Sequence, residues 1–202
     1  MPRRDLNVED RYDWRPREFR LLGDVEPESA RDAFALAMQF HAGGLRCLAS
    51  VNVGPGLEGL IRESVPGFVC LAFASELYLK ALHIMKLGAV PTDGKRGIHD
   101  LKDLYDRLPE PVRATIAFRF GGPTTLPRAD FEERLPLIAK VFTAWRYIYE
   151  KNPGDMEFTT LIMLPLALFQ VIHQAEPAWP APQEAFLTKA RLPMAQFWFL
   201  GG

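Results

Sequence analysis

Hydrophobic residues recur at three- and four-residue spacing through most of residues 29–176, which is the period of one face of an α-helix. The clearest run, spaced alternately four and three apart, is Phe131, Leu135, Ile138, Phe142, Trp145 and Tyr149. It predicts a helix packed nearly parallel or antiparallel to its neighbours, which Pro136 either kinks or opens. No segment alternates convincingly as a strand. The pattern therefore predicts an all-α fold, an antiparallel up-and-down bundle of four to five main helices with short accessory helices.

Capping and turn residues predict where the helices begin and end. Ser29 is a plausible N-cap for a first helix that reaches about Ser50. Pro66 suits the first turn of a second helix, and Gly88 suits the position just past its end. The glycine-rich segment 54–59 between the two helices is predicted to be a loop. Further helices are predicted over residues 101–108, 112–120 and 156–174.

Composition divides the chain into a charged N-terminal arm (1–28), one helical domain (29–176) and a proline-rich tail (177–202). The formal net charge of -1 means that any anion-binding surface must be local. The N-terminus has no secretory signal pattern, and the longest apolar run, 161–172, is short for a membrane span. We therefore expect a cytoplasmic protein without membrane contact.

Motifs for metal, dinucleotide and hydrolase chemistry find little support. Gly54, Gly56 and Gly59 match the dinucleotide-binding glycine pattern, but no strand–turn–helix context accompanies them. Cys47 and Cys70 are too few and too far apart for a disulfide scaffold or a zinc site, and we interpret each as a small hydrophobe. No metal or other cofactor is expected.

Three polar residues near the second and third predicted helices are candidates for function. Glu76 and Lys80 are one helical turn apart, and the plain interpretation is a surface ion pair worth a few tenths of a kcal/mol. His99 begins the next predicted helix, where a capping or packing role is the plain alternative. The other histidines, His41, His83 and His173, lie in apolar helical surroundings and are predicted to be core or interface residues.

Further cations lie in a loop and on the late helix. Lys95 and Arg96 are adjacent in the loop that follows Gly88. Arg146 lies among aromatic residues that include Tyr149, and an arginine in such a setting can stack on a base or bind a phosphate through two hydrogen bonds. It can equally lock its own helix to a neighbour.

Together these segments resemble the HEPN family, the higher eukaryotes and prokaryotes nucleotide-binding domain. The matching stretches are Ala74-Ser-Glu-Leu-Tyr-Leu-Lys-Ala-Leu82, His99-Asp-Leu-Lys-Asp-Leu104 and Trp145-Arg-Tyr-Ile-Tyr-Glu150, within roughly residues 65–175. The resemblance implies a helical bundle that usually forms a homodimer. Its members are metal-independent endoribonucleases or non-catalytic nucleotide or RNA binders, often in toxin–antitoxin or defence systems.

The arginine–histidine pair of the nuclease members is missing from this sequence. Arg146 matches the position of the arginine, but no histidine follows it before His173. The resemblance therefore favours a non-catalytic module that binds a nucleotide or RNA through Lys80, Glu76, Lys95, Arg96, His99, Arg146 and Tyr149. One alternative is an endoribonuclease that uses His99 with Arg146. Another is an assembly module without a ligand, whose tail residues 197–200 dock on a protein partner.

Overall fold

The computed structural model describes residues 29–49, 57–94, 96–121, 128–139 and 158–179. This part of the chain is almost entirely helical, which confirms the all-α prediction. The helices are α1 (Ala30–Ala49), α2 (Leu57–Leu87), α3 (Leu101–Asp106), α4 (Glu110–Gly121), α5 (Arg128–Ile138) and α7 (Phe158–Ala175). A two-stranded antiparallel hairpin, β1 (Thr92–Asp93) and β2 (Arg96–Gly97), lies in the loop between α2 and α3, where no strand was predicted.

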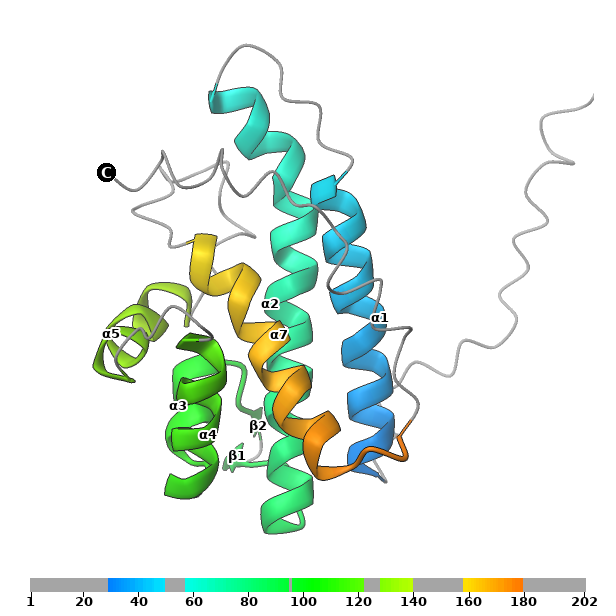
Figure 1. The fold of residues 1–202 in the computed structure, drawn as a ribbon, viewed down its shortest axis with the longest axis vertical. Coiled ribbons are helices and arrows are strands. Elements are labelled where there is room, and N and C mark those ends of the chain that lie inside the picture. The colour runs from blue at the N-terminus through cyan, green and yellow to red at the C-terminus, as the bar shows by residue number, and fades with distance from the viewer. Residues whose placement is uncertain (1–28, 50–56, 95, 122–127, 140–157, 180–202) are drawn as a thin grey trace, which may run out of the picture.

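The long helix α2 is the centre of the arrangement. Figure 1 shows α1 running antiparallel along one side of α2, while α7 crosses it and the short helices α3, α4 and α5 lie on the side away from α1. Helix α2 contacts α1, α7 and α3, and α7 also contacts α4 and α5. Because α2 has neighbours on several sides, it is apolar around most of its circumference.

Two glycines allow α1 and α2 to approach closely. A Cβ atom on Gly44 would lie 2.8 Å from the backbone oxygen of Gly67, and one on Gly67 would lie 2.8 Å from the Leu48 side chain. Contacts this short mean that a side chain at either position would force its neighbours to move. The antiparallel register is therefore set by backbone-to-backbone packing at this point.

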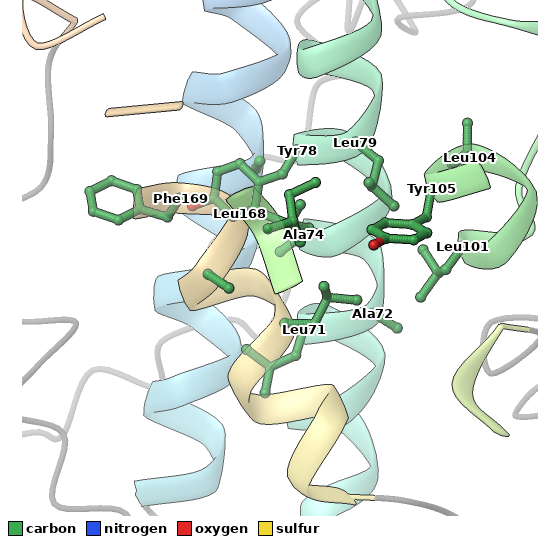
Figure 2. Close-up of a cluster of buried hydrophobic side chains, with 14 of the residues drawn as sticks. Leu71, Ala72, Ala74, Tyr78, Leu79, Leu101, Leu104, Tyr105, Leu168 and Phe169 are labelled. Atoms are coloured by element: carbon green, nitrogen blue, oxygen red, sulfur yellow. The ribbon is translucent and has the colours of Figure 1, made fainter. Parts of the chain in front are cut away.

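Aromatic packing joins α1, α2 and α7 in the core. The ring of Phe34 on α1 lies 5.7 Å from Tyr78 and 5.8 Å from Phe169, measured between centroids. Figure 2 shows Tyr78 on the side of α2 that meets Phe169, and Leu79 on the side that meets Tyr105 of α3. All five side chains are buried, so one continuous core connects the antiparallel pair to the shorter helices.

Several predicted helix ends are confirmed by the observed caps. The Ser29 hydroxyl oxygen accepts a hydrogen bond from the Asp32 amide at 3.2 Å, as an N-cap does. Helix α2 ends at Leu87, and Gly88 follows with a φ of 80°, the left-handed conformation that favours glycine. The last helix also lies within two residues of its predicted bounds.

One prediction based on proline was wrong, and another is tested only in part. Helix α2 begins at Leu57 and carries Pro66 in its interior, so residues 57–59 of the predicted loop are helical. Pro66 is exposed, so water can reach the backbone groups that proline leaves unpaired. The predicted helix over 131–149 is described only in part: α5 ends at Ile138 with Pro136 in its interior, Ala139 lies in a turn, and residues 140–149 lie outside the described residues. The Ala139 carbonyl accepts a hydrogen bond from the Leu101 amide, at the start of α3.

Two helices are long and apolar enough to cross a membrane by length and composition alone. They are residues 64–87 of α2 and the whole of α7, and 61% and 56% of their most apolar windows are buried against the rest of the structure. Burial of this kind is equally typical of core helices in soluble proteins. The cytoplasmic location therefore stays a prediction.

Candidate functional site

Glu76 is a buried carboxylate in the middle of α2. Its side chain is only 2% exposed, and its Oε1 atom lies 2.6 Å from Nζ of Lys80, one turn later on the same helix. The predicted ion pair is therefore present, but its carboxylate is buried, whereas the sequence pattern alone suggested a pair on the helix surface. A carboxylate at this depth keeps its charge only with a partner, and Lys80 supplies one.

His99 approaches the same oxygen from a different part of the chain. Its Nδ1 atom lies 3.0 Å from Glu76 Oε1, although the two residues are separated by the hairpin and the end of α2. Ile98 anchors the segment because its side chain is buried in the core. Directly after His99, the Asp100 carboxylate accepts hydrogen bonds from the Lys102 and Asp103 amides and caps α3. His99 thus precedes α3, which begins at Leu101, instead of starting the helix as predicted.

The hydrogen-bond chemistry of this group sets the orientation of the imidazole. An ionised carboxylate only accepts hydrogen bonds, so Nδ1 of His99 donates to Glu76, and the neutral ring then has an acceptor at Nε2. The His99 side chain is 61% exposed, whereas that of Lys80 is 17% exposed. The Glu76–Lys80–His99 group therefore presents an oriented imidazole at the surface, and Lys80 binds the same carboxylate oxygen.

The hairpin lies beside the exposed imidazole. A Cβ atom on Gly97 of β2 would be 4.0 Å from His99 Nε2. Arg96 is the other residue of β2 and pairs with Asp93 across the hairpin. The backbone of one predicted loop cation is therefore next to the Glu76–Lys80–His99 group.

The structure tests only part of the predicted site. Glu76, Lys80 and His99 come together. Lys95, Arg146 and Tyr149 lie outside the described residues, and Arg96 is described through its backbone alone. The proposed pairing of Arg146 with His99 therefore stays a prediction.

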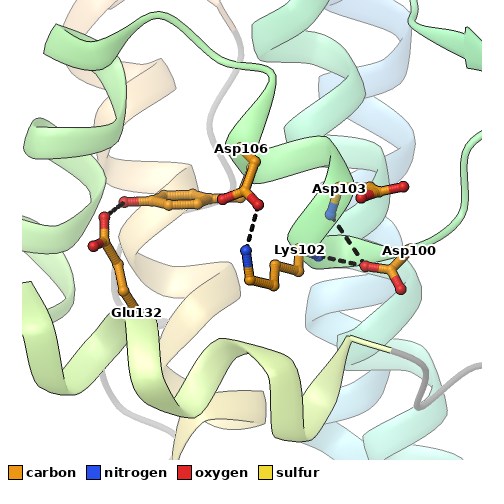
Figure 3. A network of polar contacts seen from close by, with 6 residues as sticks. Asp100, Lys102, Asp103, Asp106 and Glu132 are labelled. Atoms are coloured by element: carbon orange, nitrogen blue, oxygen red, sulfur yellow. Dashed lines mark hydrogen bonds and ion pairs between the residues drawn. The ribbon is translucent and has the colours of Figure 1, made fainter.

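A second lysine–carboxylate pair with the same spacing lies on the surface of α3. Lys102 Nζ contacts Asp106, and the two side chains are 42% and 43% exposed. Figure 3 shows this pair between the Asp100 cap and Glu132, which accepts a hydrogen bond from the Tyr105 hydroxyl. It is an ordinary solvated ion pair and provides an internal comparison for Glu76 and Lys80.

Two histidines predicted to be core residues are buried and hydrogen-bonded. Nδ1 of His41 lies 3.3 Å from the Tyr78 hydroxyl, and burial lowers the pKa of His41 to about 4. Burial also raises the pKa of Tyr78. Nε2 of His83 lies 2.7 Å from the Leu104 carbonyl and joins α2 to α3, and burial lowers its pKa as well. The His41–Tyr78 pairing had no signal in the sequence, because only the helix register brings the two residues together.

One hollow in the described part of the chain lies away from these residues. It has a volume of about 360 Å³ and lies between the C-terminal ends of α2 and α7 and the start of α4, with Lys86, Val112 and Gln174 among its lining residues. None of its lining residues belongs to the Glu76–Lys80–His99 group. Among the described residues, no group of three or more His, Cys, Asp or Glu is placed to hold a metal ion.

No family model, curated protein or solved structure matches this chain.

Proposed function

We propose that the chain is a non-catalytic module that binds a phosphate-bearing ligand, a nucleotide or RNA, at the Glu76–Lys80–His99 group. The observation that carries the proposal is the contact of one buried carboxylate oxygen with both Lys80 and His99. A buried ion pair is not needed for stability alone, since well-packed apolar residues in its place often make a protein equally stable. A carboxylate that holds one nitrogen of an exposed imidazole fixes its tautomer and orientation, which is an arrangement used at functional sites.

The charges of the group suit an anionic ligand. Glu76 and Lys80 balance each other, so protonation of His99 would make the group positive. The adjacent loop would add Lys95 and Arg96 as phosphate contacts. In the proposal, Arg146 and Tyr149 complete the site with a second cation and an aromatic face for a base.

The proposal is tested by titrating nucleotides and short RNAs against the protein in calorimetry and thermal-shift assays. His99→Gln is the informative variant, because an exposed side chain can be changed with little effect on folding. We expect it to weaken binding roughly tenfold, which corresponds to the loss of about 1.4 kcal/mol. Lys102→Met is the matched control, because it removes an exposed lysine from a neighbouring helix. Equal affinities for both variants and the unchanged protein would rule out this site.

Metal-independent RNA cleavage is a second candidate, and one specific contact favours it. Glu76 holds Nδ1 of His99, which leaves Nε2 to accept a proton from a 2′-hydroxyl, as in carboxylate–histidine pairs of hydrolases. Arg146 would stabilise the charge that develops on phosphorus.

Cleavage of a fluorescent RNA in the presence of EDTA tests this candidate. We expect His99→Gln and Arg146→Ala each to lower the rate at least about a hundredfold, the usual contribution of a general base or of a charge-stabilising group. Intact RNA after prolonged incubation with the unchanged protein would leave binding as the function.

The homodimer is a separate part of the proposal. Three large apolar side chains are exposed among the described residues: Leu87, Phe118 and Leu137. Phe118 is the most exposed, at 75%, and it is a reasonable first position to change. Light scattering of Phe118→Ser and of a chain truncated after residue 179 would show whether α4 or the tail takes part in assembly.

A further inference from the structure

Cys47 on α1 and Cys70 on α2 lie at nearly the same level of the antiparallel helix pair. The contacts around them give the register, since Leu48 meets Gly67 and Gly44 meets Leu71. Cys47 falls between the two contact positions on α1, and Cys70 falls between the two on α2. Because Leu48 meets Gly67 in this antiparallel pair, Cys47 lies level with Phe68, which is two residues, or roughly 3 Å along the axis, from Cys70.

The two cysteines also lie on the same flank of the pair. Phe40 of α1 and Phe73 of α2 meet edge to face on this flank, with ring centroids 4.6 Å apart. Cys47 comes two helical turns after Phe40, and Cys70 comes about one turn before Phe73, so both cysteines extend the same flank. Both cysteines are half-buried.

The backbones of α1 and α2 approach each other closely near the cysteines. The backbone oxygen of Gly67 would lie 2.8 Å from a Cβ on Gly44, so the two backbones are in contact one turn from each cysteine. A disulfide needs Cα atoms roughly 4.4–6.8 Å apart, a separation that only such close helix pairs provide. Electrostatic repulsion from Cys47 also contributes, after burial, to the raised pKa of Cys70, which is consistent with neighbouring sulfur atoms.

We propose that Cys47 and Cys70 form an oxidisable thiol pair that closes to a disulfide and joins α1 to α2. The oxidant would be a low-molecular-weight disulfide. One cysteine thiolate attacks it, which forms a mixed disulfide and releases the first small thiol. The second cysteine thiolate then attacks the protein-bound sulfur and releases the second small thiol. Two electrons pass from the protein to the oxidant, and the two cysteine protons pass to the released thiols.

The pairing changes the interpretation of these residues as separate small hydrophobes. It does not depend on the proposed ligand, because neither cysteine belongs to the Glu76–Lys80–His99 group. The raised pKa of Cys70 leaves little thiolate at neutral pH, so closure is expected to be slow there and faster at higher pH.

The test measures whether the fold favours the disulfide. The full chain is equilibrated in reduced and oxidised glutathione, starting from both the reduced and the oxidised protein, in buffer and in concentrated urea. Samples are quenched with acid, alkylated and weighed by mass spectrometry. Because the chain has 2 cysteines, loss of both alkylation sites from a monomer identifies the bond. Cys47→Ser and Cys70→Ser are controls that cannot form it.

We expect the equilibrium constant for disulfide formation to be at least about tenfold larger in buffer than in urea, since that ratio equals the factor by which the bond stabilises the fold. The oxidised protein should accordingly melt several degrees higher than the reduced protein. An equal or smaller constant in buffer would show that the fold holds the thiols apart and would overturn the proposal. Formation of only disulfide-linked dimers or glutathione adducts would overturn it as well.

Discussion

The pairs Glu76–Lys80 and Lys102–Asp106 are built from the same chemistry at the same helical spacing, yet their surroundings are opposite. In α2 the carboxylate is 2% exposed and shares one oxygen with a lysine and a histidine. In α3 both partners are more than 40% exposed and contact each other beside water. The α3 pair gains little, because solvent screens it and its side chains lose entropy. The α2 pair has lost its hydration, so each member depends on the other.

Removal of either lysine should sharpen this comparison the most. Lys80→Met leaves the buried carboxylate of Glu76 without its cation, and we expect a loss of about 3–5 kcal/mol in the free energy of unfolding. Lys102→Met should cost less than about 0.5 kcal/mol. Urea denaturation of the two variants measures both values. Lys80→Arg, which keeps the charge, should restore part of the stability. Similar small losses for both methionine variants would mean that the depth of Glu76 has no energetic consequence.

The histidines also differ in burial, since His41 is buried and His99 is exposed. The pH dependence of the free energy of unfolding measures the consequence for His41. The pKa of buried His41 is about 4 in the folded protein against 6.5 for an ordinary histidine. Below pH 6.5 the unfolded chain therefore takes up a proton that the folded chain refuses, so stability falls as the pH drops from 6.5 toward 4. The loss approaches about 3 kcal/mol. The lowered pKa of His83 acts in the same direction.

His41→Gln removes this titration and should flatten the acid side of the stability curve. The measurement is the free energy of unfolding in urea at several pH values between 7 and 4.5, compared with the unchanged protein. Parallel curves for the two proteins would mean that His41 is protonated as easily in the folded chain as in the unfolded one.

Neighbouring glycines on α1 provide a third contrast between buried and open positions. Gly44→Ala would force a Cβ atom against Gly67 and Leu71, and we expect it to cost about 1–3 kcal/mol. A Cβ on Gly43 meets nothing within 4 Å, so Gly43→Ala should stabilise the helix by about 0.5–1 kcal/mol. Thermal unfolding of both variants checks the opposite signs. A stabilised Gly44→Ala variant would contradict the close approach of α1 and α2.

Local signals in the sequence predicted those features that depend on a few adjacent residues. The N-cap at Ser29 and the end of α2 at Gly88 follow from side-chain and backbone preferences that act within one turn. The same reasoning was wrong at Pro66, where the helix continues on both sides. Packing of α2 against several neighbours there outweighs the local preference of proline, and no local pattern reports that packing.

The candidate site was predictable in its members but not in its geometry. Spacing alone paired Glu76 with Lys80, but it could not show that the pair is buried. One signal for burial was present in the sequence. Because α2 is apolar around most of its circumference, a charged residue in its middle has little chance of facing solvent. The contact of His99 with Glu76 depends on the hairpin and on the buried Ile98, which are tertiary features.

The smallest expected effect compares two aspartates of the α3 segment. Asp100 accepts hydrogen bonds from two backbone amides at the start of the helix, whereas the Asp106 carboxylate pairs with a solvated lysine. Asp100→Ala should therefore cost about 1 kcal/mol, as the loss of an N-cap does, and Asp106→Ala less than about 0.5 kcal/mol. Urea denaturation separates values of this size when the variants are measured side by side. Because Asp100 follows His99 directly, its loss should also loosen the imidazole, which nuclear magnetic resonance of the His99 ring would detect. If Asp106→Ala proved the more costly change, side-chain pairing at the surface of α3 would matter more than backbone capping. The small contribution assigned to an exposed ion pair would then be wrong, and with it the contrast between the buried and the exposed pair.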